Sequence, residues 1–170
     1  LARRSGLAPV RVDFAGAVAR LAAQEDQQFG GFGGAPKFPV TPALCFLLDR
    51  GRAGDAAASA LATRTLDAMA GSDLADRDGG FFRYATRRDW TEPHYERMLY
   101  DNAQLLAAYA LADRPAVAEG IANFLLGTLR LPSGALASAQ DSESTVGGVR
   151  VEGGYYALDA AARASESPPA

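Results

Sequence analysis

An alternation of apolar segments with loops rich in Gly, Pro and aromatic residues constrains the fold more than any other feature of this sequence. The apolar segments are long enough for helices. Several begin at an Asp or a Thr-Pro step and end at Gly, as capped helices do. We therefore expect helices at residues 13–26, 41–51, 55–71, 92–112 and 115–130, with an Ala-rich helix near the end of the chain.

The loops between these helices carry signs of short strands. The segment "DGGFFRYATRRDWTEPH" is typical of a hairpin, and "GGYYALD" is interpreted as a further strand. Strands this short cannot build an extended sheet, so the sequence predicts an all-α array of antiparallel helix hairpins with short β-hairpins in the loops. We expect one domain at residues 13–162, a lead-in at 1–12, and a linker or truncated end at 163–170.

Charge and composition exclude several classes of function. The chain has 170 residues, a formal charge of −3 and no basic stripe, which argues against nucleic acid as a partner. No apolar run reaches the roughly 18 residues of a membrane span and no signal peptide is recognisable, so we expect a cytoplasmic protein without a membrane partner. Cys45 is expected to be a core residue. One histidine without clustered cysteines gives no metal-ligand spacing, and we expect neither a metal nor another cofactor.

The glycine-rich segment "GGFGGAPKFP" does not predict a phosphate-binding loop. It lacks the Gly-Lys-Ser/Thr ending of such a loop, and no strand precedes it. Its glycines are expected to allow positive φ angles in a tight turn. Phe32 and Phe38 would anchor this loop, and Lys37 is expected to lie on the surface.

The predicted helix at 92–112 contains the only histidine of the chain. On a helical wheel of about 100° per residue, His94 and Asp101 share the edge of the apolar face, while Asn102 points into its middle. Asn102 would then fasten the helix inside the core through hydrogen bonds. His94 and Asp101 fit either such a structural network or proton transfer, since imidazole titrates near neutral pH. Glu96 would project away from His94.

A second polar segment, "ASAQDSES", places Asp141 and Glu143 on the same side of an extended chain. Two such carboxylates can serve acid/base chemistry, bind sugar hydroxyls, or simply lie in a solvated loop. No Gly-x-Ser-x-Gly elbow occurs, so the signal for a serine hydrolase is absent.

Several motifs in order along the chain resemble one family. These are "GGFGGAPKFP", "DGGFFRYATRRDWTEPHYERMLYDNAQLLAAY", and "SAQDSES" followed by "EGGYYALD". They are similar to the thioredoxin-domain-containing proteins that include spermatogenesis-associated protein 20 and its bacterial relatives, over roughly residues 13–160. Residues 95–97 read Tyr-Glu-Arg where the family usually has Phe-Glu-Lys, and residues 141–143 read Asp-Ser-Glu in place of Asp-x-Asp.

The resemblance implies a thioredoxin-like domain followed by a six-hairpin α/α toroid, as in N-acylglucosamine epimerases, cellobiose epimerases and several glycosidases. This chain has no Cys-x-x-Cys, does not begin with Met, and has about half of the helices of a complete toroid. We therefore expect an excised or truncated partial (α/α)6 toroid, whose partners are the rest of the toroid and the thioredoxin-like domain.

The resemblance also implies a central cavity at the ends of the inner helices and a carbohydrate as its ligand. In the first hypothesis, His94 transfers a proton in sugar epimerisation or isomerisation, with Asp101 and Asp141 as acid/base groups. The sugar would be bound by Arg83, Tyr84, Trp90 and Glu143, with Trp90 stacking on its face. A glycosidase-like hydrolase is less favoured, because no clear carboxylate pair heads the strongest motif. The second hypothesis is a non-catalytic binding or scaffold domain.

A partial toroid would expose the apolar surface of its inner helices, so we expect this chain on its own to form a homodimer or to aggregate. Light scattering over a concentration series would then report a mass above that of the monomer. A clean monomer at high concentration would contradict this expectation.

Overall fold

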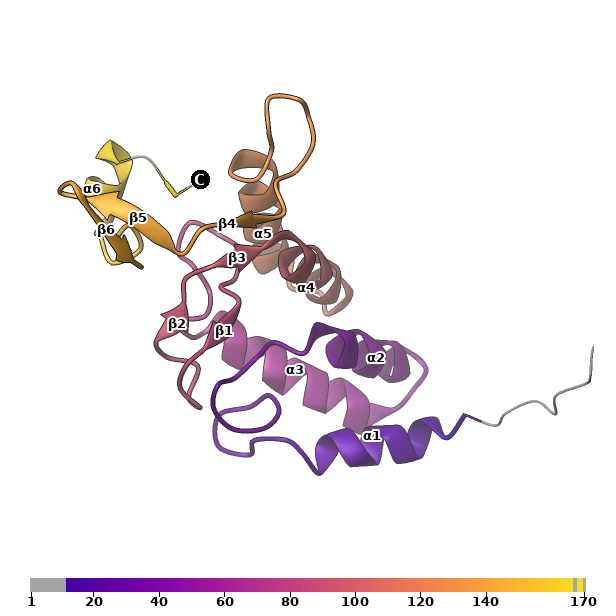
Figure 1. Cartoon of the computed structure of the whole chain (residues 1–170). Helices are drawn as coiled ribbons and strands as arrows, with labels where there is room; N and C mark the ends of the chain where they lie inside the picture. Colours follow the sequence, from indigo (N-terminus) through magenta and orange to yellow (C-terminus); the bar gives the residue numbers. More distant parts are fainter. Residues whose placement is uncertain (1–11, 167, 170) are drawn as a thin grey trace, which may run out of the picture.

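The computed structural model describes residues 12–166 and 168–169, and Figure 1 shows their arrangement. The helices of this part of the chain are α1 Phe14–Ala22, α2 Thr41–Arg52, α3 Ala56–Ala70, α4 Leu99–Leu111, α5 Pro115–Gly127 and α6 Ala160–Ser165. The strands are β1 Tyr84–Ala85, β2 Pro93–His94, β3 Arg97–Met98, β4 Ala139–Gln140, β5 Glu143–Val146 and β6 Val149–Glu152. The protein is therefore helical with small two-stranded sheets. The predicted lead-in lies outside the described residues, apart from Val12.

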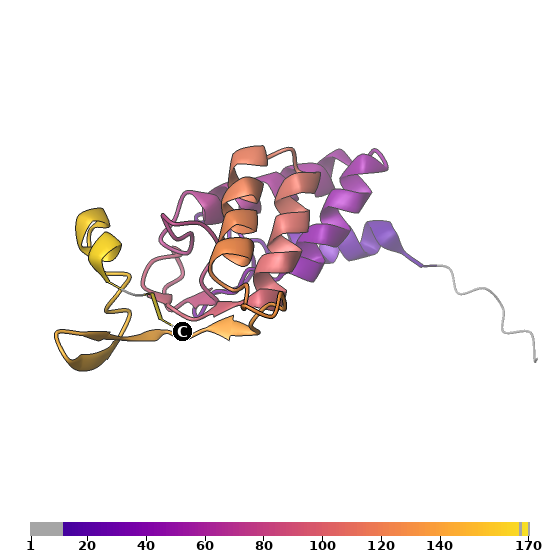
Figure 2. The ribbon, with the colours of Figure 1, turned by 90° about the horizontal axis from the view of Figure 1, so that it is seen from above.

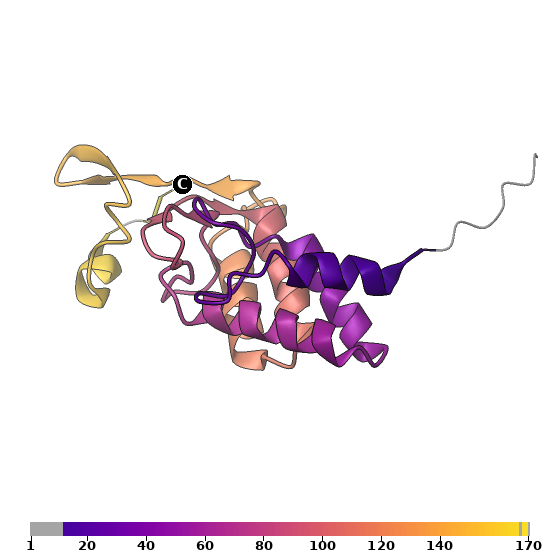
Figure 3. The ribbon, with the colours of Figure 1, turned by 90° about the horizontal axis from the view of Figure 1, so that it is seen from below.

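The helices pack in consecutive pairs. α2 contacts α3, α4 contacts α5, and α2 and α4 contact each other between the two pairs. Short loops join the members of each pair, which makes them antiparallel. Figure 2 shows these helices side by side, with β3, β4 and the β5–β6 hairpin along one edge, and Figure 3 shows the same edge from the other side. No helix among the described residues is long and apolar enough to cross a membrane.

The core lies between α2, α3, α4 and α5. Its fully buried side chains include Leu44, Leu47, Leu61, Leu66, Met69, Leu105, Tyr109 and Phe124. Cys45 is half-buried and packs against this core, and burial raises the pKa of its thiol.

Some of the predicted helix ends agree with the structure and others do not. The carboxylate of Asp55 accepts a hydrogen bond from the Ala58 backbone N–H at 3.0 Å, and α3 ends at Ala70, directly before the predicted stop. Thr41 is not the cap of α2, because the helix already includes it and Val40 occupies the cap position. α1 and α5 are also shorter than predicted, ending at Ala22 and Gly127.

The predicted start of a helix at Glu92 is wrong. α4 begins only at Leu99, and the six residues before it form β2, β3 and the two residues that join them. Glu92 itself has a φ angle of 52°, which a right-handed helix does not allow. The backbone of this segment instead forms antiparallel strand pairs, β2 with β1 and β3 with β4. The helical wheel used above therefore does not apply to His94.

The prediction of a strand at "GGYYALD" is also wrong. This segment forms turns after a hairpin made by β5 and β6, which are joined by Gly147 and Gly148. Both glycines have positive φ angles, 59° and 82°, as a two-residue hairpin turn requires. The Gly-Gly dipeptide carried this signal in the sequence, and it places the strands at residues 143–152, on the N-terminal side of the predicted segment.

Lys37 is fully buried, contrary to the prediction that it lies on the surface. Its Nζ donates to Oδ2 of Asp26 at 2.7 Å and lies 5.0 Å from the ring centroid of Trp90. Arg88 donates to both oxygens of the same carboxylate, at 2.7 and 2.8 Å. The burial of Lys37 is thus tolerated because a carboxylate and an aromatic ring replace its water.

Asp26 gives a pH-dependent prediction. The hydrogen bonds from Arg88, followed by that from Lys37, hold the pKa of this carboxyl far below its ordinary value. A depressed pKa stabilises the fold above the unfolded-state value of 3.8, and this stabilisation is lost as the pH falls below it. We expect Asp26→Asn to lower the unfolding free energy by about 3 kcal/mol at neutral pH, because Lys37 is left without its counterion.

Urea unfolding at pH 7 and pH 3 measures this effect, and the difference from the unchanged protein should shrink at the lower pH. The control is Asp67→Asn, which removes an exposed pair with Arg114 and should leave the unfolding midpoint in place. Equal losses in the two variants would refute the role of Asp26.

Asn102 lies at 0% exposure in the core and makes three hydrogen bonds. Its Oδ1 accepts from the Phe81 N–H at 2.7 Å, and its Nδ2 donates to the carbonyls of Phe81 and Met98, each at 3.0 Å. These bonds fasten the first turn of α4 to the loop that precedes β1.

Replacing Asn102 with Ala should leave the buried N–H and C=O of Phe81 without partners. We expect a loss of about 3 kcal/mol in the free energy of unfolding, measured by chemical denaturation. Asn123→Ala on the exposed side of α5 is the matched control and should change little. Similar values for both variants would contradict a fastening role for Asn102.

Candidate functional site on the outer face of the β1–β2 pair

The backbone of Lys37 adds a third segment to the β1–β2 pair. Its N–H donates to the Ala85 carbonyl at 2.8 Å, and its carbonyl accepts from the Ala85 N–H at 2.9 Å. Ala85 in turn faces Pro93 across the pair. All three of these residues are buried, and because side chains alternate along an extended chain, their neighbours point outward. The outward set is Phe38, Tyr84 and His94.

These three outward side chains form an aromatic row. The ring of Tyr84 lies between the other two, with its centroid 4.8 Å from that of Phe38 and 5.0 Å from that of His94. Tyr84 and His94 are direct partners across the strands, and their rings are nearly parallel at 17°. Phe38, which was predicted to anchor its loop, packs on Tyr84 and is 43% exposed.

His94 has a carboxylate partner that the sequence did not indicate. Its Nδ1 lies 2.7 Å from Oε1 of Glu152 on β6, 58 residues further along the chain. A carboxylate accepts hydrogen bonds, so Nδ1 donates to Glu152, and in this tautomer of a neutral imidazole the lone pair lies on Nε2. That atom lies 3.8 Å from Oε2 of Glu96, which contradicts the prediction that Glu96 projects away from His94.

A cation and a further carboxylate lie beside the histidine. Arg83 donates to Oε2 of Glu96 at 2.7 Å, and this bond raises the pKa of Arg83. Asp101, in the first turn of α4, is half-buried, and its burial raises the pKa of its carboxyl group, while the charge of Arg83 acts in the opposite direction. Glu96 thus links His94 to Arg83, and the charges of Arg83 and Glu96 both act on Asp101.

Trp90 does not share this face. It is 1% exposed, and its indole N–H donates to the Phe29 carbonyl at 3.0 Å. One edge of the ring lies so close to Gly31 that a Cβ added there would meet it at 2.4 Å. This buried position does not fit the predicted stacking of Trp90 on a sugar.

Asp141 and Glu143 lie on the same side, but both bind Arg150 of β6 rather than His94. Asp141 accepts from Arg150 Nη2 at 2.7 Å, and Glu143 pairs with its Nε. Together with Ser165 and Pro169, they line a pocket of about 460 Å³ between the β5–β6 hairpin and the end of the chain. Glu143 nevertheless lies directly opposite Glu152, the partner of His94, across the β5–β6 pair.

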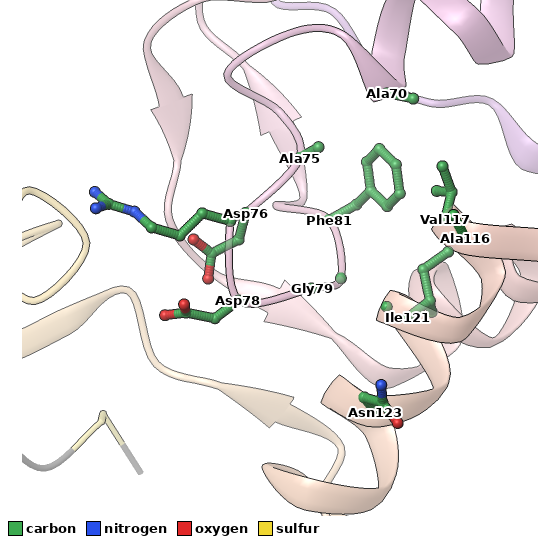
Figure 4. Close-up of a pocket in the computed structure, with 13 residues that line it drawn as sticks. Ala70, Ala75, Asp76, Asp78, Gly79, Phe81, Ala116, Val117, Ile121 and Asn123 are labelled. Carbon is green, nitrogen blue, oxygen red and sulfur yellow. The ribbon is translucent and has the colours of Figure 1, made fainter. Parts of the chain in front are cut away.

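The pocket in Figure 4 lies between the end of α3, the loop before β1, and α5. Its volume is about 410 Å³, and Asp76 is one of its polar groups. Both oxygens of Asp76 are bound, to Arg97 at 2.8 Å and to Arg163 at 2.9 Å. Among the described residues, no group of three or more His, Cys, Asp or Glu side chains could hold a metal ion.

The ion network around Asp76 fixes the position of the strands that carry part of the candidate site. Arg97 on β3 is 2% exposed, donates to Oε1 of Gln140 on β4, and lies 4.0 Å above the ring of Phe124. Arg163 donates to the Tyr156 carbonyl at 2.6 Å and so binds the segment after β6 to the same cluster. The position of β6, which carries Glu152, therefore depends on these buried charges.

The fold is similar to that of a sugar epimerase. Cellobiose 2-epimerase from Spirochaeta thermophila matches with a TM-score of 0.58 at 23% sequence identity, over 75% of this chain and 40% of the epimerase. At this identity, the likeness shows the fold alone. No family model matches the chain.

The sequence is homologous to spermatogenesis-associated protein 20, as the motifs suggested. The identity is 39% over 146 residues for the proteins of Homo sapiens and Mus musculus, and covers 77% of this chain. The matched part is 19% of the human protein and 18% of the mouse protein, so the chain spans about a fifth of the length of these relatives.

Proposed function

We propose that this chain is part of a carbohydrate-active α/α toroid in which His94 transfers a proton during epimerisation or isomerisation of a sugar. The observation that carries the proposal is the contact between Nδ1 of His94 and Glu152, because it leaves the lone pair of Nε2 available as a base. The fold likeness to an epimerase supports a sugar as the substrate class.

The reaction would proceed through an enolate. Nε2 of His94 removes the proton from the carbon next to the carbonyl of an open-chain sugar, and the electron pair moves onto the carbonyl oxygen. The guanidinium of Arg83 lies beside Glu96 and can stabilise that negative charge. Return of the proton to the other face of the carbon gives the epimer, and no cofactor is consumed. Asp101, whose carboxyl holds its proton more tightly than usual, is the second acid/base group.

The alternative is a non-catalytic binding domain that partners a thioredoxin-like domain. It is supported by the ion pairs that Arg83 and Glu152 already make with Glu96 and His94, since such a network is satisfied without a ligand. The same ion pairs can also hold His94 in a fixed orientation as a general base. A measurement of turnover therefore distinguishes the catalytic function from the binding function.

The test uses the full-length protein with glucose, mannose, N-acetylmannosamine and cellobiose in D2O, and detects deuterium uptake at the carbon by NMR. We expect His94→Gln to lower the rate at least about a hundredfold, because a positioned general base contributes that much. Glu152→Gln should lower it about tenfold, since the imidazole loses its orienting partner.

Asp67→Asn, on the exposed side of α3, is the control and should keep the full rate. Unchanged turnover in His94→Gln would remove His94 from the mechanism. Calorimetry that detects no sugar binding at all would favour the binding-domain alternative.

A further inference from the structure

Phe38 is the exposed end of the aromatic row. Its neighbour Lys37 is held inward by Asp26, and this burial forces the ring of Phe38 to the outer face. Tyr84 covers one side of that ring, at 4.8 Å between centroids. A phenylalanine left 43% exposed, in the same aromatic row as His94, offers an apolar surface that the core does not use.

The spacing within the row determines what could lie on this surface. One tyrosine ring separates Phe38 from His94, so a single sugar whose carbon faces Nε2 of His94 does not also reach the outer side of Phe38. A second sugar joined to the first extends past Tyr84 and reaches it. The C–H groups on one face of a pyranose are apolar and pack on an aromatic ring, which has a large, rigid surface.

We propose that Phe38 forms a second sugar-binding position next to His94, so that the site prefers a disaccharide or longer substrate over a monosaccharide. This inference rests on the carbohydrate class of the proposed function and adds the length of the substrate. Phe38 would act in binding, while the proton transfer stays with His94. Tyr84, covered on both sides by its neighbours, spaces the two positions.

Titration calorimetry of the full-length protein with glucose and with cellobiose tests the inference. The unchanged protein should bind cellobiose more tightly, and Phe38→Ala should weaken cellobiose binding about tenfold, while glucose binding stays within about twofold. Phe38→Tyr keeps a ring at this position and should retain the preference. Circular dichroism confirms that each variant is folded.

Phe14→Ala is the matched control. Phe14 is 46% exposed, lies on α1 and contacts Phe46 rather than the aromatic row, so its removal should leave the binding of both sugars unchanged. Equal weakening of glucose and cellobiose in Phe38→Ala, or no weakening, would overturn the inference.

The inference and the proposed function fail in different ways. Binding of cellobiose through Phe38 without any deuterium uptake would refute proton transfer and keep the second position. Turnover that is lost in His94→Gln but unchanged in Phe38→Ala, with no effect of Phe38→Ala on cellobiose binding, would refute the second sugar-binding position and keep proton transfer by His94. A full-length protein that binds neither sugar would refute both.

Discussion

The carboxylate of Asp26 is the group on which the arrangement of the candidate site depends. It receives hydrogen bonds from Lys37 and Arg88, which come from two loops far apart in the sequence, and it is almost fully buried. By holding Lys37 inward it aligns that segment with Ala85, and this alignment places Phe38 beside Tyr84 on the outer face. A change in this pair would therefore affect the site without touching any of its exposed side chains.

A second buried cluster positions the other half of the site. Arg97 and Arg163 share the carboxylate of Asp76, and the first also binds Gln140. Charges buried in this way are costly unless they are paired and hydrogen-bonded, so the network has few alternative arrangements. It ties β3 to β4 and to α6, and the hairpin between those elements brings Glu152 to His94. Two buried ion clusters thus position the two parts of the candidate site, one at Phe38 and one at His94.

Much of the helical part was predictable because its signals are local. The cap at Asp55, the proline at the start of α5, and the glycine after α3 each act within one or two turns of the chain. The helix start near His94 was not predictable in this way. Residues 93–98 have a sequence that suits a helix, but their backbone groups pair with β1 and β4, which lie elsewhere in the chain.

By itself, the sequence determined the helical class, most of the helix positions, and the segment that contains the candidate site. It did so because capping and apolar periodicity are properties of neighbouring residues. Only the tertiary structure decided which side chains meet there. Trp90 turned inward, Lys37 became buried, and Glu152 arrived from 58 residues away, since each is placed by a partner distant in sequence. Pairings between residues so far apart produce no local pattern in a single sequence. They nevertheless determine which side chains stabilise the fold and which face a ligand.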